Sequence, residues 1–263
     1  MSTVSYAMQD SATMLRRNLR RTLRYPVAAA AGVGIPIVLL LLFVFVFGDT
    51  LGAGLVGVSG GRDEYLDYVT PGIILIAVAG AAQGTAISVA MDMTEGIVAR
   101  FRTMAIARVS VLTGHVVGSL IQTMVAIAVV IGVALLLGFG PTAGPLDWTL
   151  AIGLLAMTTF ALIWLAVALG MVTKNVETAS NLPLPLILLP FLGSGFVPTD
   201  SMPAGMRWFA EYQPFTPIME TLRGLLLGTP VGNSGLLAVA WCAGIGLAGH
   251  LWAKHLFNRD PMP

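Results

Sequence analysis

Charge is scarce in this sequence. Only 10% of its 263 residues are Asp, Glu, Lys or Arg, whereas 56% are hydrophobic. A soluble domain usually carries roughly 25% charged residues. The composition therefore excludes a chain whose surface is mostly covered by water.

Cysteine is almost absent as well. The one cysteine, Cys242, lies inside an apolar run, which excludes an intrachain disulfide and a metal site built from several thiolates. The three histidines, His115, His250 and His255, are not at the spacing of a ligand cluster. We therefore expect no bound metal and read Cys242 as a buried thiol.

Lysine is also rare, and its placement excludes one kind of nucleotide site. Lys174 and Lys254 follow Thr173 and Ala253, so the phosphate-binding pattern GxxxxGK[ST] does not occur. We expect no enzyme activity and no catalytic residues in this chain. Matching interrupted helices in two halves, the mark of many inverted-repeat transporters, are also missing.

Long uncharged runs are abundant. A hydrocarbon core of about 30 Å needs about 20 apolar residues per helix, and each of six runs is long enough. The runs cover residues 26–47, 69–91, 109–140, 148–173, 178–199 and 233–253. They predict an all-α integral membrane protein with six transmembrane helices in one domain, 1–263. The first run is longer than the roughly 7 to 15 residues of a signal peptide, so we expect it to stay uncleaved.

The basic residues predict the orientation of these helices. With the N-terminus inside, eleven Lys and Arg residues lie in inner segments and three, Arg62, Arg207 and Arg223, in outer ones. Cytoplasmic segments retain positive charge. We therefore expect a multi-pass protein of the cytoplasmic membrane with both termini in the cytoplasm.

Residues 10–25 have the pattern of an amphipathic helix. Leu15, Leu19 and Leu23 share one face, and the opposite face is rich in arginine. The arginines are Arg16, Arg17, Arg20, Arg21 and Arg24. Such a helix lies in the membrane surface against anionic lipid headgroups. The alternative is a simple basic tether before the first span.

The segment 92–108 is the only substantial cytoplasmic loop in this topology. Ile97, Phe101 and Met104 form one apolar face of a short helix, and Arg100, Arg102 and Arg108 border it. A short helix of this kind suits docking into a groove on a soluble partner. The alternative is a loop held by lipid phosphates.

The last third contains many helix breakers. Seven prolines between 183 and 217, together with Gly193 and Gly195, forbid one straight helix, so we expect the fifth helix to end around 193–197. Short extracellular helices should follow in 200–228, one of them over 217–227 with Thr216 as its cap and Gly228 at its end.

Two spacings suggest contacts. Glu220 and Arg223 are three residues apart and could pair on one helix face, as a gate element or as a structural ion pair. Gly80 and Gly84 form a GxxxG spacing, which favours close helix packing.

Two motifs resemble those of the ABC-2 type permeases, especially the daunorubicin and doxorubicin resistance branch. The first is the cytoplasmic stretch from Glu95 to Arg102. The second runs from Phe191 to Pro198 and is followed by Met202-Pro203 and by Gln213 to Pro217. Ala105 departs from the family, in which a proline is common after the arginine-rich stretch.

The resemblance implies the permease half of an exporter. It would dimerise with a second copy or a paralogue, and a separate ATPase subunit in two copies would hold ATP and Mg, so that no cofactor binds this chain and no nucleic acid is expected as a partner. The coupling residues implied are Glu95, Gly96, Ile97, Arg100, Phe101 and Arg102. The outer gate implied consists of Phe191, Gly193, Gly195, Pro198 and Pro203, with Glu220 and Arg223 further on.

The substrate and two other functional classes stay open. The resemblance and the apolar spans favour an amphipathic drug or lipid-like substrate, whereas related permeases export polysaccharides or lipid-linked glycans. Gly193-Ser194-Gly195 with a late His250 is also compatible with an intramembrane serine protease, although Leu192 stands where that motif needs glycine. A membrane scaffold without transport is the third class.

Overall fold

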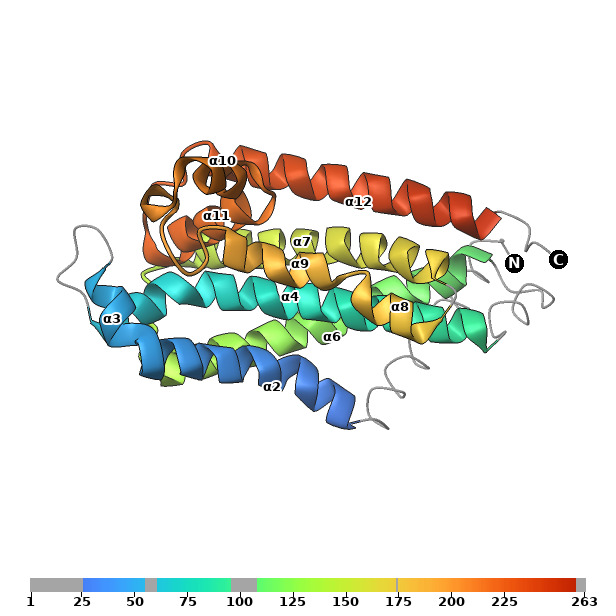
Figure 1. Cartoon of the computed structure of the whole chain (residues 1–263), viewed down its shortest axis with the longest axis horizontal. Helices are drawn as coiled ribbons and strands as arrows, with labels where there is room; N and C mark the ends of the chain where they lie inside the picture. Colours follow the sequence, from blue (N-terminus) through green and yellow to red (C-terminus); the bar gives the residue numbers. More distant parts are fainter. Residues whose placement is uncertain (1–25, 55–60, 96–107, 174, 259–263) are drawn as a thin grey trace.

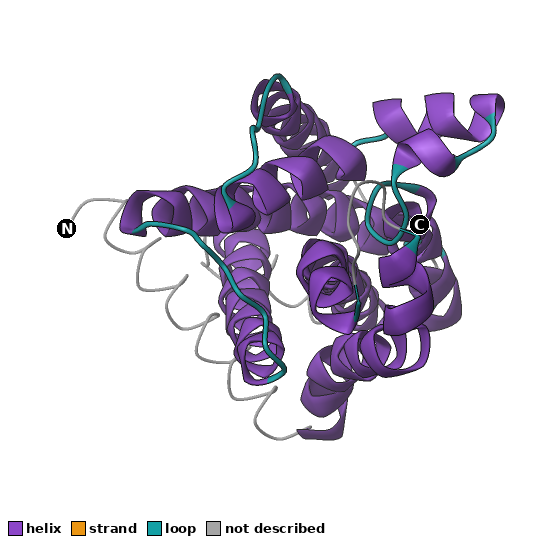
Figure 2. Ribbon diagram, turned by 90° about the vertical axis from the view of Figure 1, so that its left-hand side faces the viewer, coloured by secondary structure: helices purple, strands orange, loops and turns teal. Residues whose placement is uncertain are grey.

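The computed structural model describes residues 26–54, 61–95, 108–173 and 175–258. Throughout these ranges the chain forms helices joined by short loops, without a strand (Figure 2). The expected interfacial helix at 10–25, with its arginines Arg16, Arg17, Arg20 and Arg21, lies outside the described residues. So does most of the expected coupling segment.

Long apolar helices make up most of the bundle. In the described ranges, five are long and apolar enough to cross a membrane. The first combines α2 (Pro26–Leu42), a π-helical turn (Phe43–Phe47) and α3 (Gly48–Ala53). The others are α4 (Arg62–Thr94), α6 (Arg108–Leu136), α7 (Pro145–Val172) and α12 (Ser234–Asn258). These helices confirm an all-helical protein with several membrane-spanning segments.

Helix α4 lies in the middle of the bundle. It packs against α2, α6, α7 and α8, and Figure 1 shows α2, α4, α6 and α7 running in alternately opposite directions, whereas α12 runs in the same direction as α7. Its central residues from Val69 to Ala79 are all buried. Two ends of the bundle can be told apart: α3, α10 and α11 lie at one, and the last turns of α4 and α12 lie at the other (Figure 1). We call these the α10 end and the Asn258 end.

Glycines bring some of these helices into close contact. A Cβ at Gly170 of α7 would lie 2.5 Å from the carbonyl oxygen of Ala86 in α4, and one at Gly249 of α12 would lie 2.6 Å from the backbone nitrogen of Leu165. By contrast, a Cβ at Gly80 or Gly84 would meet nothing within 4 Å. Within the described chain neither glycine of the GxxxG pair packs closely against another helix, whereas Nε2 of Gln83 between them donates to the carbonyl oxygen of Ser180 in α8 at 2.6 Å.

Helix α4 begins at Arg62, seven residues before the expected start of the second span. The backbone N–H of Gly61 donates a hydrogen bond to Glu64 at 2.8 Å, and Asp63 and Glu64 stand in the first turn, where the helix dipole favours acidic residues. The expected span 69–91 followed the apolar run and lies inside this helix, because a capped helix can extend past an apolar run into polar surroundings.

Prolines divide the fifth expected span, 178–199. The helical part is 17 residues long, Val176–Leu192, and consists of α8 (Val176–Asn181), α9 (Leu184–Leu188) and a 3-10 turn (Leu189–Leu192). Pro183, Pro185 and Pro190 lack the N–H groups that a continuous α-helix needs. The segment nevertheless runs back along α4 toward the α10 end (Figure 1), although it ends one residue before the expected range 193–197.

Short helices follow at the α10 end. They are a 3-10 turn (Thr199–Ser201), α10 (Ala204–Tyr212) and α11 (Phe215–Leu227). Helix α11 ends as expected, because Gly228 has φ 71° in the left-handed region. The capping role expected for Thr216 is wrong, since α11 begins at Phe215 with Pro214 in the cap position. Thr216 instead takes part in the network described below.

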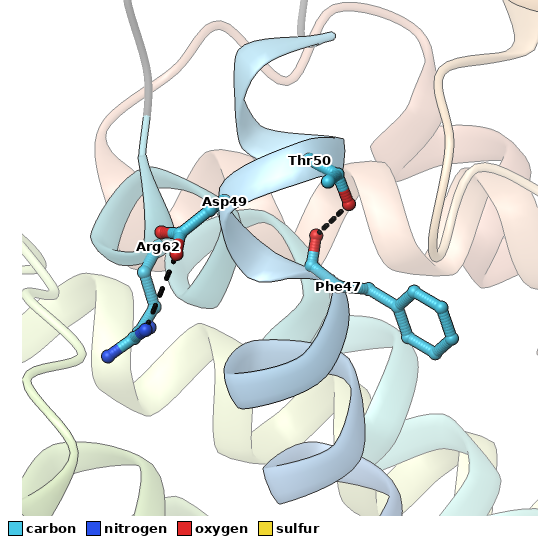
Figure 3. Close-up of polar contacts among 4 residues, drawn as sticks. All are labelled: Phe47, Asp49, Thr50 and Arg62. Atoms are coloured by element: carbon cyan, nitrogen blue, oxygen red, sulfur yellow. Dashed lines mark hydrogen bonds and ion pairs between the residues drawn. The ribbon is translucent and has the colours of Figure 1, made fainter.

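The junction of α3 and α4 lies at the same end. Arg62 at the start of α4 forms an ion pair with Asp49 of α3 at 3.4 Å (Figure 3). The guanidinium carbon of Arg62 lies 5.1 Å from the ring centroid of Phe45. In α3 the hydroxyl of Thr50 donates to the carbonyl oxygen of Phe47 at 2.9 Å. The ion pair attaches α3 to the first turn of α4.

Candidate functional site

The carbonyl group of Ser194 is the centre of a hydrogen-bond network at the α10 end. It accepts one bond from the Tyr68 hydroxyl at 2.9 Å and another from Nη2 of Arg223 at 2.8 Å. Nη2 of Arg223 also donates to the carbonyl oxygen of Tyr68 at 3.2 Å. We call these residues, with Gln213 and Thr216, the Ser194 network. It joins α4, α11 and the turn after the broken fifth segment.

Gln213 and Thr216 hold the other side of this turn. The Thr216 hydroxyl accepts bonds from the backbone N–H of Ser194 at 3.3 Å and from Nε2 of Gln213 at 3.0 Å. Oε1 of Gln213 accepts from the backbone N–H of Phe215 at 3.1 Å, which fixes the start of α11. Residues 193–196 form no regular helix and are buried, so their backbone groups need such partners.

Two of the expected gate residues are glycines in positions where a side chain would collide. A Cβ at Gly193 would overlap Gln213 and Thr216, and one at Gly195 would lie 2.9 Å from Sδ of Met219. On the other side of the contact, a Cβ at Gly72 would lie 2.8 Å from the carbonyl oxygen of Gly195. Helix α4 and the 193–196 turn therefore touch backbone to backbone.

A phenylalanine cluster adjoins the turn. Phe191 and Phe196 stack with ring centroids 4.7 Å apart and an interplanar angle of 5°. The ring centroid of Phe43 lies 4.4 Å from that of Phe196, and Phe43 belongs to the π-helical turn of the first long helix. Turns of π-helix are rare in proteins, and those that occur are frequently found at functional sites. Because this one lies beside the expected gate residue Phe191, the region is a candidate site.

Arg223 brings a positive charge into this apolar region. Its guanidinium carbon lies 3.9 Å from the ring centroid of Tyr68, and its Nε is buried and has no hydrogen-bond partner among the described residues. Burial lowers the pKa of Arg223, and Tyr68 and Glu220 oppose that shift. The ordinary pKa of arginine is so high that the group stays charged.

The expected pairing of Glu220 with Arg223 is wrong. Glu220 accepts a hydrogen bond from the Ser234 hydroxyl at 2.9 Å, and the Arg223 bonds go to backbone carbonyls. Helical spacing allowed the pair, but each side chain reaches a different neighbouring segment. Glu220 thus ties α11 to the start of α12, whereas Arg223 ties α11 to α4.

The remaining expected gate residues lie outside the Ser194 network. Pro198 precedes the 3-10 turn, and Pro203 precedes α10 and accepts a bond from the Arg207 N–H at 2.8 Å. Arg207 forms exposed ion pairs with Asp200 at 2.6 Å and Glu211 at 2.7 Å. Its bond to Glu211, followed by the charge of Asp200, raises its pKa. These contacts shape α10 rather than the buried turn.

The coupling residues are placed only in part. Glu95 ends α4 and is exposed, and its backbone N–H donates to the carbonyl oxygen of Met91. Gly96, Ile97, Arg100, Phe101 and Arg102 lie outside the described residues. Their role stays a prediction.

Sequence reasoning missed Tyr65 and Tyr68 in α4. Tyr65 donates to the carbonyl oxygen of Phe196 at 3.3 Å, parallel to the bond from Tyr68 to Ser194. Two tyrosines three residues apart at the end of an apolar run are a usable signal, because a buried hydroxyl needs a partner. Gly72 carried no such signal, since only the tertiary contact shows why it is glycine.

The geometry around Ser194 does not support a serine protease. The Ser194 hydroxyl is buried and has no hydrogen-bond partner in the described part of the chain. His250 contacts the Trp164 ring edge-on at 4.4 Å. His250 lies sixteen residues along α12 from Ser234, which begins this helix at the α10 end. That separation corresponds to about 24 Å, so His250 is far from the Ser194 turn at the α10 end. Within the described ranges, no three His, Cys, Asp or Glu residues are placed to hold a metal ion.

Comparisons with known proteins indicate the family of this chain. The profile of the ABC-2 type transporter family matches residues 10–227. The daunorubicin resistance ABC transporter permease protein DrrB1 of Streptomyces coeruleorubidus is 30% identical over 169 residues, which cover 64% of this chain and 59% of that protein. The match thus spans less than two thirds of this relative.

Two further relatives are more distant. The probable doxorubicin resistance ABC transporter permease protein DrrC of Mycobacterium tuberculosis is 26% identical over 70% of this chain and 67% of its own length. ABC transporter G family member 20 of Dictyostelium discoideum is 28% identical over 63% of this chain and 23% of its own length. Since the family profile covers most of the chain and the described helices include several apolar ones of spanning length, this multi-pass membrane protein belongs to the ABC-2 type transporter family.

Proposed function

We propose that this chain is the permease subunit of an ATP-binding-cassette exporter that moves an amphipathic drug or lipid-like substrate outward. The observation that carries the proposal is the family match over residues 10–227, joined to relatives whose names describe permeases of drug resistance. A separate ATPase subunit supplies the energy, since the sequence contains no phosphate-binding loop of its own.

The α10 end is the outer end of the pathway in this proposal. The bias of eleven basic residues against three supports that orientation. The broken segment Val176–Leu192 then also crosses the membrane and raises the number of crossings from five to six, because it connects the Asn258 end with the α10 end (Figure 1). A segment of seventeen residues at the helical rise reaches about 25 Å, and the buried turn at 193–196 completes the distance.

The Ser194 network serves as the outer gate. It joins three segments through directional bonds around one carbonyl group, and the phenylalanine cluster beside it is apolar. A packed arrangement of this kind is suited to two discrete positions rather than a gradual deformation. Opening of this gate requires either that Arg223 and Tyr68 break their hydrogen bonds to the Ser194 carbonyl group or that they move together with the Ser194 turn.

The segment 92–108 receives the force of the ATPase. It connects α4 to α6 at the Asn258 end, and α4 contributes Tyr65, Tyr68 and Gly72 to the gate region at its other end. A rigid α4 therefore offers a direct mechanical path from the ATPase to the gate. ATP binding drives the change only if the ATPase holds one conformation of this segment more tightly than the other.

Coexpression with a candidate ATPase tests the proposal. The two subunits should copurify, and daunorubicin, chosen from the names of the relatives, should stimulate ATP hydrolysis and be transported into inside-out vesicles. Phe101→Asp should leave membrane insertion intact and abolish transport, whereas Phe101→Leu should preserve it. Failure of the wild-type chain to bind any candidate ATPase would refute the exporter assignment, and unchanged transport by Phe101→Asp would refute the coupling role alone.

A further inference from the structure

Two ionisable side chains meet inside the Asn258 end of the bundle. Nε2 of His115 lies 3.1 Å from Oδ2 of Asp92. Asp92 belongs to the last turn of α4, two residues before the helix ends at Thr94, and His115 lies near the start of α6. The contact therefore joins the two helices on either side of the connection 95–107.

This pair is buried. The side chain of Asp92 is 3% exposed and that of His115 is 11% exposed. A second apolar cluster, separate from the main core, occupies this part of the bundle and includes Val89 of α4, Val116 of α6 and Trp164 of α7. Ionisable groups in such surroundings cost free energy and are rare in membrane helices unless they have a function.

The hydrogen-bond geometry indicates how His115 is held. Its Nδ1 is buried and has no partner in the described part of the chain. A buried N–H without an acceptor costs more than an unused lone pair. This cost is avoided when the ring proton lies on Nε2, which then donates to the Asp92 carboxylate, and Nδ1 carries only a lone pair.

Apolar contacts alone allow helices to slide past one another, whereas a buried hydrogen bond fixes both distance and direction. We propose that Asp92 and His115 are a positioning pair that makes the ends of α4 and α6 move as one unit during coupling to the ATPase. The pair sits at the base of the 95–107 connection, so that both helices follow any displacement of that connection. This proposal rests on the proposed function for its role in transport.

Three variants separate a role in coupling from a role in folding alone. His115→Gln retains an N–H that can reach Asp92. His115→Leu removes it and leaves the carboxylate without this partner. Asp92→Leu/His115→Leu replaces both groups by apolar ones, a change that is often neutral or stabilising for a buried pair. Thr158→Val is the control, since its hydroxyl contacts Cys242 Sγ at 3.3 Å between α7 and α12, in an equally buried position.

The readout is daunorubicin transported per ATP hydrolysed in the complex with the ATPase. We expect His115→Gln and Thr158→Val to resemble the wild type. His115→Leu and the double variant should lose about tenfold in this ratio, although the double variant regains the thermal stability lost in His115→Leu. Recovery of transport together with stability in the double variant would overturn the proposal and leave a purely structural pair.

A second measurement needs neither substrate nor ATPase. Nitroxide labels are attached to Thr94→Cys and Ile121→Cys, both exposed positions, in a Cys242→Ala chain, and their distance distribution is recorded. The distribution should be narrow in the wild-type background and with His115→Gln, and broader with His115→Leu. Equal widths would contradict the positioning role, even if the exporter assignment itself failed.

Discussion

Gly72 and Gly195 lie so close that a Cβ on Gly72 would stand 2.8 Å from the carbonyl oxygen of Gly195 and 3.0 Å from its Cα. This is a contact between the most buried long helix and the turn that follows the broken fifth segment. Because the obstructing atoms belong to the backbone, they cannot rotate away as a side-chain end could. The contact sets the distance between α4 and the 193–196 turn.

Gly72→Ala should therefore destabilise the protein. The added methyl group forces α4 and the turn apart, a kind of overpacking that costs about 1–3 kcal/mol. Gly80→Ala on the same helix is the matched control, since the space beside Gly80 is open and alanine favours helix by about 1 kcal/mol. Thermal unfolding in detergent should show a lower Tm for the first variant and an unchanged or higher Tm for the second. Equal Tm values would contradict the close contact.

Arg223→Ala should be more damaging than Arg207→Ala. The first removes a buried donor to two backbone carbonyl groups, with a cost of about 3 kcal/mol or roughly 10 °C in Tm. The second removes exposed ion pairs, which contribute about 0–1 kcal/mol. Arg223→Lys should recover only part of the loss, because one ammonium group cannot replace the planar stack on Tyr68. Similar losses for Arg207→Ala would contradict this ranking.

The sequence was informative wherever a local rule decides the structure. Run lengths predicted long helices over most of the correct ranges, and Gly228 ended α11 as expected. The helix is longer than the apolar run where a capped polar turn extends it, as at Arg62. The length of the fifth segment depends on the combined effect of three prolines on the backbone. The helix propensity of any single residue does not predict that effect.

Tertiary partners were beyond the reach of spacing rules. Glu220 and Arg223 are correctly spaced for a pair, yet they bond to Ser234 and to Ser194, because segments from elsewhere in the chain offer better partners. Gly80 and Gly84 fit a packing motif and face open space. The burial of an aspartate against His115 was likewise invisible, since the two residues lie on different helices.

Cys242 should report unfolding without any engineering. It is the single cysteine of the sequence, it is 2% exposed, and it lies against Thr158 between α7 and α12. A fluorogenic maleimide should label it slowly in the folded protein and rapidly at the thermal transition, since access requires separation of these helices. Labelling at the rate of a free thiol before that transition would show that the thiol is accessible in the native bundle.

Labelling from opposite sides of the membrane should decide whether the broken fifth segment is a sixth crossing. In a Cys242→Ala chain, single cysteines are placed at Glu177, Trp208 and Asn258, which are all exposed. If Val176–Leu192 crosses and the α10 end is outside, an impermeant maleimide added to intact cells should label only Trp208→Cys. The other two should react after permeabilisation, since Glu177 lies in the first turn of the segment and Asn258 ends α12. Labelling of Glu177→Cys from outside would place both ends of the segment on one face and contradict the sixth crossing. Labelling of Asn258→Cys but not of Trp208→Cys would instead reverse the orientation derived from the basic residues.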